Sequence, residues 1–401
     1  MADTQPVQAA PAGAVKRRRG LVWTLIVLAA VITLVSSMTV WVKRQALDTD
    51  SWTTASTQLL EDEQVRHALS VYVVDQLYAN GDVAGRLEER LPPDLSGLAG
   101  PLAGALREPA VTAVDRLLER PRVQELWEEV NRVAHQQLLA ILDGNPRPNV
   151  STTDGTVVLD LRSFVVDVGT QLGIGDQLGE RLPADVGQVT VLESDQLATA
   201  QDVVKGIKAL SVLLAGFTFI LWGLALWLAN GWRREALRGI GASLLVVGLL
   251  LLVVRRLAGN YVVGALTSGG EIRDAANTTW LVGTSLLAEI GWAGVIYGVC
   301  LVAGTWLTGP SRTARDVRAR TAPVLVQRPG LAWTMFGAVF LLVVWWGPTP
   351  ALRRPLGLLI LTALVAAGIE LLRRQVVAEQ EHDVLAAPQP AAEPAAVPTP
   401  R

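Results

Sequence analysis

The apolar segment Leu21–Val42 constrains this chain more than any other, because it carries no charge and is long enough to cross a membrane. An α-helix needs about 20 apolar residues to span a hydrocarbon core of roughly 30 Å. Four basic residues, Lys16–Arg19, precede the segment, and Trp23 and Trp41 lie near its ends. Basic residues stay on the cytoplasmic side, and tryptophan favours the membrane interface. The segment therefore predicts a transmembrane helix that begins in the cytoplasm.

A cleaved signal peptide is the alternative interpretation of this segment. Such a peptide has an apolar core of about 7–15 residues followed by a cleavage site with small side chains. Here the apolar run is longer, and the nearest small pair, Ser36-Ser37, leads into Met38–Trp41. These features favour an uncleaved anchor.

Five more apolar segments follow after a long polar region, so the hydropathy criterion predicts about six transmembrane helices. The later segments are Ala209–Ala229, Leu237–Val254, Gly283–Leu307, Leu331–Gly347 and Leu356–Leu372. One set of alternate loops carries Arg233, Arg234, Arg238, five arginines from Arg312 to Arg328, and Arg373-Arg374. The other set carries fewer in total: Arg255-Arg256, Arg273 and Arg353-Arg354. The positive-inside rule then predicts two cytoplasmic termini in the plasma membrane.

This topology divides the chain into five parts. Residues 1–20 form a disordered basic cytoplasmic N-terminus, 21–42 the first transmembrane helix, and 43–208 an extracytoplasmic domain. Residues 209–372 form the membrane domain, and 373–401 a disordered cytoplasmic tail rich in alanine and proline. Half of all residues are hydrophobic, which is consistent with an integral membrane protein.

The exported domain is predicted to be mostly helical. Capping oxygens at Asp48–Asp50 precede an amphipathic run that stops at Asn80-Gly81, and Pro121 opens a second amphipathic helix that ends near Asp143. The pattern around Leu59-Leu60-Glu61 recurs around Leu117-Leu118-Glu119, which suggests two stacked helical hairpins.

A small two-stranded β element interrupts the helices. The β-branched run Thr156–Leu161 and the segment Gln188–Leu192 are the two strands, and their long connection favours parallel pairing. From Ser194 a helix is expected to continue into the second membrane segment. The predicted fold class is therefore mainly α: a polytopic membrane protein with a mostly helical extracytoplasmic domain.

The residues that usually carry catalysis are scarce. The only cysteine is Cys300, and the exported domain holds only His67 and His135, so no cofactor or metal site is predicted. Asp160 and Glu193 form a carboxylate pair only if the two strands bring them together. The net charge of −2 argues against nucleic-acid binding. The sequence predicts that the protein is not an enzyme.

The most distinctive polar set is Trp127, Asn131 and His135, which four-residue spacing places on one helix face, with Glu128 and Arg132 alongside. These side chains either line a recognition groove, or Trp127 packs in the core while Asn131 and His135 hydrogen-bond to a neighbouring element. The second interpretation is preferred.

In the membrane segments, Glu289 is the most notable ionisable residue, because charge is costly inside a bilayer and is usually functional there. Gly291, Gly294, Gly298 and Gly304 place small residues along the same segment and predict close helix packing.

Several sequence segments of the chain resemble segments of uncharacterised multi-pass membrane proteins of actinobacteria. They are Leu47–Trp52, Leu126–His135, Gly155–Leu161 and Ser194–Leu197. The resemblance covers the first anchor, the exported domain and the second membrane segment. It implies this topology and an actinobacterial host, and it implies no activity.

Together these features predict a non-catalytic, membrane-anchored module for envelope interaction or sensing. Its expected partners are the lipid bilayer and a protein or cell-wall component that contacts the exported domain. The alternative is a transporter, or an accessory subunit of a transport complex, in which Glu289 faces a cavity. A membrane-bound hydrolase is the last alternative.

Overall fold

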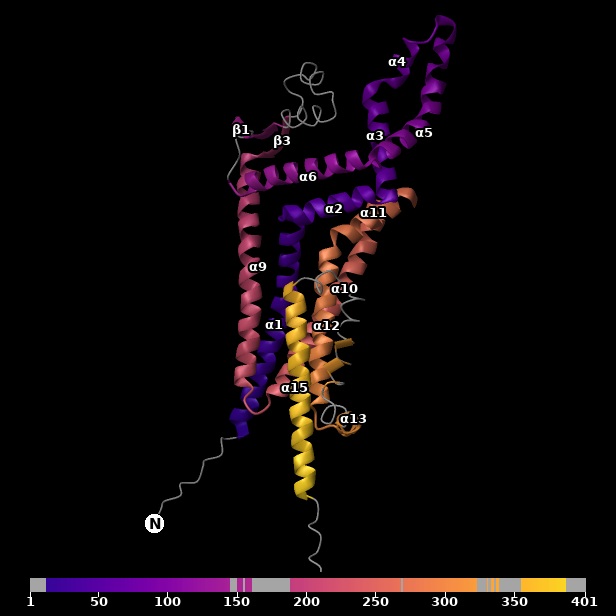
Figure 1. Cartoon of the computed structure of the whole chain (residues 1–401). Coiled ribbons are helices and arrows are strands. Elements are labelled where there is room, and N and C mark those ends of the chain that lie inside the picture. Colours follow the sequence, from indigo (N-terminus) through magenta and orange to yellow (C-terminus); the bar gives the residue numbers. More distant parts are fainter. Residues whose placement is uncertain are drawn as a thin grey trace, which may run out of the picture. The chain divides into compact units, whose positions relative to one another are not determined.

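The computed structural model describes residues 12–144, 150–153, 156–160, 188–267, 270–322 and 355–386, with isolated helical residues at 330, 333–334 and 337–338 (Figure 1). In this part of the chain nearly every element is a helix. Four of the described helices are long and apolar enough to cross a membrane, as the sequence predicted for these regions. They are Arg18–Ala46, Gln196–Leu228, Arg233–Leu266 and Ser285–Leu307.

The last two predicted membrane segments are not among these four helices. Most of Leu331–Gly347 lies outside the described residues. The segment Leu356–Leu372 falls within the helix α15 (Pro355–Ala386), which is not among the four.

The chain forms two compact units. The first consists of 1–30, 221–249 and 291–401, and the second of 31–220 and 250–290. Four helices contribute residues to both units: α1 (Ala12–Ala46), α9 (Ser194–Leu228), α10 (Arg233–Leu266) and α12 (Ser285–Leu307). The continuous α9 includes both the amphipathic start and the membrane segment that the sequence joined into one helix.

The second unit is built mainly from short helices. In chain order they are α2 (Thr49–Glu61), α3 (Glu63–Gly81), α4 (Val83–Glu88), the 3₁₀ helix η1 (Pro93–Leu98), α5 (Ala99–Leu118) and α6 (Pro121–Leu142). The prediction of one continuous run from Asp48 to Gly81 is wrong. Asp62 ends α2 in an extended conformation, and its carboxylate caps α3 by accepting from the backbone N–H groups of Gln64 and Val65 at 3.1 Å.

The recurring sequence pattern marks two equivalent helix junctions. The first copy crosses from α2 into α3, and the second crosses from α5 into α6. The helices then pair crosswise, α2 with α6 and α3 with α5 (Figure 1). Two stacked hairpins would instead pair each helix with its own neighbour. The helix α11 (Gly270–Gly283), which the sequence did not predict, packs on α2 and α3.

The β element has three strands: β1 (Val150–Thr153), β2 (Thr156–Asp160) and β3 (Gln188–Glu193). The two expected strands are β2 and β3, but their predicted parallel pairing is wrong, because β2 pairs antiparallel with both neighbours. A long connection permits a parallel crossover without requiring one. The long connection between these two strands, residues 161–187, lies outside the described residues.

The first unit contains a small apolar core made by three helices. Val22 and Ile26 of α1 pack with Ala225 and Ala229 of α9 and with Ile240 of α10. Small residues on α9 allow the helix backbones to approach closely, which is how helices associate in lipid, where burial from water contributes little.

The helices α10 and α12 cross at glycines, as the sequence predicted from the small residues of α12. A Cβ atom added to Gly298 would lie 2.6 Å from the backbone nitrogen of Leu245, and one added to Gly248 would lie 2.7 Å from the backbone nitrogen of Val295. Gly304 takes no part in this crossing, since a Cβ atom there would meet nothing within 4 Å.

Candidate functional site

Among the described residues of the second unit, the junction between α1 and α2 combines a helix cap, a buried histidine and an aromatic stack. The helix α1 ends at Ala46, and α2 begins at Thr49 after only two residues. Asp48 fixes the turn, because its side chain accepts a hydrogen bond of 2.9 Å from the backbone N–H of Ser51. This N-cap holds the start of α2 close to the end of α1.

His135 of α6 connects both helices at this junction. Its side chain is buried, with Nε2 3.2 Å from the carbonyl oxygen of Ala46 and Nδ1 3.2 Å from the hydroxyl oxygen of Thr49. A carbonyl oxygen only accepts, so the neutral ring carries its proton on Nε2 and accepts from Thr49 at Nδ1. The imidazole thus satisfies a carbonyl at the end of α1, where intrahelical partners run out.

The surroundings of His135 favour the neutral ring. Burial lowers the pKa of the imidazole below its ordinary value, while the bond to the Ala46 carbonyl and the charge of Asp48 act in the opposite direction. Trp52 of α2 stacks on the imidazole with ring centroids 5.0 Å apart and planes 14° apart. The ring is therefore held on its two nitrogens and on one face.

The other predicted site residues lie along the same pair of helices. Trp127 donates its indole N–H to the carbonyl of Ser56 in α2 at 3.1 Å. Arg132 reaches the carboxylates of Glu128 at 2.6 Å and Asp50 at 3.4 Å. These contacts attach α6 to α2 along two further turns.

Asn131 behaves differently. Its amide donates to the carbonyl of Trp127 in its own helix at 2.8 Å, so the expected bond to a neighbouring element is wrong for this residue. One turn separates the two residues, and an amide side chain reaches that carbonyl without leaving its own helix.

The sequence reasoning missed Thr49 and Trp52, although a signal was present. Thr49, Trp52, Thr53 and Ser56 follow each other at intervals of three, one and three residues, which places them on one face of α2. Ala46 had no such signal, because it contributes a backbone carbonyl.

The C-terminal end of α6 is bonded to α9. Gln201 donates its amide to the carbonyl of Ile141 at 2.9 Å, and the ammonium of Lys208 lies 2.5 Å from a carboxylate oxygen of Asp143. We call the contacts of His135, Trp127, Ile141 and Asp143 the α6 clamp. In this clamp one helix is bonded to α1 and α2 near its middle and to α9 at its end.

A second polar junction joins α10, α11 and α12. Arg255 of α10 donates Nε to the hydroxyl of Thr284 at 2.8 Å, and Trp280 of α11 donates its indole N–H to the carbonyl of Arg255 at 3.2 Å. The indole of Trp41 donates to the carbonyl of Gly283 at 3.3 Å. Side chains therefore tie these helices by bonding to the hydroxyl of Thr284, to the carbonyl of Arg255 within α10 and to the carbonyl of Gly283 at the end of α11.

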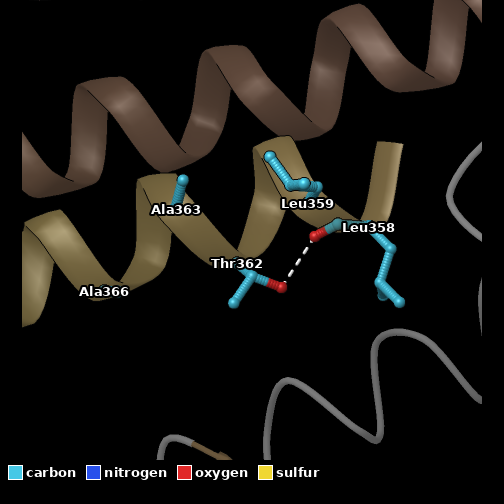
Figure 2. A pocket seen from close by; sticks show the side chains of 5 residues that line it. All are labelled: Leu358, Leu359, Thr362, Ala363 and Ala366. Atoms are coloured by element: carbon cyan, nitrogen blue, oxygen red, sulfur yellow. Dashed lines mark hydrogen bonds between the residues drawn. The ribbon is translucent and has the colours of Figure 1, made fainter. Parts of the chain in front are cut away.

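Glu289 lies half-buried near the start of α12. Two surface hollows in the described part of the chain lie away from Glu289. One is an open apolar hollow on α15, where the hydroxyl of Thr362 bonds back to the carbonyl of Leu358 at 2.7 Å (Figure 2). The other lies on the first turns of α6 and is lined by Pro121, Arg122, Glu125, Leu126 and Glu129.

The backbone register of β2 and β3 separates Asp160 from Glu193 along the ladder. Asp160 pairs with Gln188, and Glu193 pairs with Thr156 at the other end of the same ladder. Four residues along a strand span about 13 Å, whereas paired carboxylates in glycosidases are about 5–10 Å apart. Among the described residues no group of three or more His, Cys, Asp or Glu could hold a metal ion.

Four helices of the described chain are candidates for spanning a membrane, which places the chain in the class of multi-pass integral membrane proteins. Such a protein contacts the lipid bilayer. No family model, no curated protein and no solved structure matches it.

Proposed function

We propose that this protein is a non-catalytic membrane module whose helical domain, residues 43–208, contacts a protein or cell-wall component outside the plasma membrane. The observation that supports the proposal is the α6 clamp, which bonds a single helix to both membrane helices that flank the domain. A contact that displaces α6 would therefore act on the ends of α1 and α9 together.

The outer surface of α6 offers a place for such a contact. Glu125 and Glu129 are exposed on successive turns and line the polar hollow together with Arg122 and Leu126. A polar, open surface favours a partner that can be bound and released over an enclosed substrate.

The bonding pattern of the clamp also supports a role in positioning over one in chemistry. The nitrogens of His135 and the indole N–H of Trp127 are bonded to groups of α1 and α2, so these side chains hold helices together. The Thr49 hydroxyl and the His135 imidazole do lie 3.2 Å apart, but the imidazole is buried and stacked on Trp52, which suits it to packing.

The first experiment places a photo-crosslinking amino acid at Glu125 in the full chain in its native membrane. We expect a discrete adduct with one envelope protein or with cell-wall material, and a loss of that adduct when Glu129→Lys reverses the charge of the surface. Leu210, exposed on the membrane part of α9, is the matched control position and should give only lipid adducts. Diffuse labelling that is equal at both positions would contradict the proposal.

Two further experiments test its other parts. A phosphatase fused after Gly144 should be active, because this enzyme works only after export, and a cytosolic reporter at the same site should be inactive. Purified protein in nanodiscs should leave envelope polymers and lipids unchanged. Hydrolysis that disappears in Asp160→Ala would overturn the non-catalytic assignment.

A further inference from the structure

The helices α3 and α5 form an antiparallel hairpin in the second unit, closed at its far end by α4 and η1 (Figure 1). Three contacts define the direction and level of the two helices. Arg66 bonds Asp115 at 3.2 Å near the base, Arg107 bonds Asp75 at 2.9 Å, and the hydroxyl of Tyr78 donates to the carbonyl of Ala103 at 3.0 Å. The residue numbers of the contacting residues increase along α3 and decrease along α5, so the two helices are antiparallel.

The packed line between the two helices is made of small and apolar residues. Ser70 and Val74 are buried on α3, and Ala99, Ala103 and Val111 are buried on α5. The residue one position earlier in a helix lies about 100° around its axis. Because the helices are antiparallel, the residues one position before the buried ones lie on the same side of the hairpin in both helices.

That side of the hairpin is apolar and exposed. It carries Val73 and Leu77 on α3 and Leu98, Leu102 and Leu106 on η1 and α5. Leu77 is 55% exposed and Leu98 is 50% exposed. The whole segment from Leu95 to Leu106 contains no charge. We call this set of five side chains the leucine face.

The corresponding positions on the other side of the hairpin are small or charged. One position after the packed line lie Asp75 and Ala79 on α3 and Gly104 and Glu108 on α5, and Asp75 is paired with Arg107. A hairpin with one polar and one apolar side is half of an antiparallel four-helix bundle.

We propose that the leucine face is covered by the leucine face of a second copy of this chain in the same membrane. A two-fold contact sets identical surfaces against each other, so a charged face would repel itself, while this uncharged face does not. The two copies are related by a 180° rotation about an axis that lies between their leucine faces and runs parallel to the hairpins. This rotation leaves both bases at the same end, as two copies anchored in one membrane require. The rotation places α3 of each copy against α5 of the other, and every neighbouring pair in the four-helix arrangement is antiparallel.

Two chains that share a membrane need less contact area to pair than two chains in solution. An apolar patch of about 300–600 Å² is at the upper end of what single soluble proteins expose, and a stable soluble dimer needs about 800 Å² from each partner. Anchoring in one membrane raises the effective concentration, so a smaller face is sufficient for the tethered chains. The pairing holds on whichever side of the membrane the domain lies, and it does not depend on the proposed function.

The test uses two differently tagged full-length chains, both Cys300→Ser, expressed together. One carries Leu77→Cys and the other Leu102→Cys, because the Tyr78–Ala103 contact puts these positions at one level and the rotation brings them together. Copper-phenanthroline on isolated membranes should give a disulfide that joins the two tags. The matched control is Ala79→Cys with Gly104→Cys, at the same level on the polar side, which should give none.

Adding Leu106→Glu to both chains should lower the yield of the joined product by about tenfold or more, since a carboxylate would be buried without a partner. Leu106 is half-exposed, so the variant should keep the thermal unfolding midpoint of the parent. Thr112→Glu, at an exposed position on the other side of the hairpin, should leave the yield unchanged. Three results would each overturn the proposal. They are equal cross-linking on both sides of the hairpin, adducts only with other proteins, and free reaction of the leucine-face cysteines with a bulky thiol reagent.

Discussion

The α6 clamp and the crossing of α10 with α12 attach helices in opposite ways. In the clamp, side chains reach across to backbone carbonyls and hydroxyls, as His135 and Trp127 do toward α2. At the crossing, the side chains are missing, and the backbones at Gly248 and Gly298 lie directly against the partner helix. A polar bond can break and re-form in water, whereas a backbone contact has no alternative arrangement, so the clamp is suited to change and the crossing to permanence.

The largest effect should come from filling the crossing. Gly298→Leu would drive a side chain into the backbone of Leu245, and overpacking of this kind costs up to about 3 kcal/mol and occasionally more. We expect a much lower thermal unfolding midpoint in nanodiscs or loss of folded protein. Gly304→Leu is the control, because that position is open, and a similar loss there would show that the crossing is not special.

Removing the polar bonds of the clamp should have a smaller effect. His135→Phe keeps a ring for stacking on Trp52 but leaves the carbonyl of Ala46 without its partner, at a cost of about 1–3 kcal/mol. The midpoint should fall while the protein stays folded. Asn131→Ala should change it by less, because Asn131 bonds only within α6.

The clamp should also respond to pH. The pKa of His135 is lowered in the folded state, chiefly by burial, so the unfolded chain binds a proton first as the pH falls. The stabilisation is complete above the ordinary histidine pKa of 6.5 and is lost as the pH falls from there through the folded pKa. Unfolding midpoints measured from pH 8 to 5 should fall more steeply for the parent than for His135→Phe. Parallel curves would contradict this assignment.

The smallest effect should come from the ion pair at the end of α6. Lys208 and Asp143 are both about two-fifths exposed or slightly less, and exposed ion pairs contribute about 0–1 kcal/mol. A double-mutant cycle with Lys208→Met and Asp143→Asn should give a coupling energy in that range that decreases with added salt. A coupling above about 2 kcal/mol would mean that the pair, and not His135, is the main attachment of α6.

Much of the fold could be predicted because it depends on periodicity and hydropathy. Leu21–Val42 lies within α1, Pro121 begins α6, and the membrane segment after Ala209 continues the helix that starts at Ser194. The crossing was also predictable, since glycines at helical spacing favour close packing in lipid.

The parts that could not be predicted depend on partners that leave no pattern in the sequence. The carbonyl of Ala46 that bonds His135 is present in every residue type, so no sequence feature distinguishes it. The break at Asp62 was missed because the apolar pattern continues on both sides of it. The pairing of β2 with β3 was predicted with the wrong direction, because connection length alone does not determine direction.

The two-residue turn at Leu47-Asp48 has a further consequence for the first membrane helix. A membrane helix that ends in a flexible linker can rotate about its own axis without moving the domain that follows it. Here the tip of α1 is bonded to the first residues beyond the turn by way of the imidazole of a third helix. Any twist of α1 in the lipid must therefore be transmitted to α6 as torque, or else break the two bonds of His135.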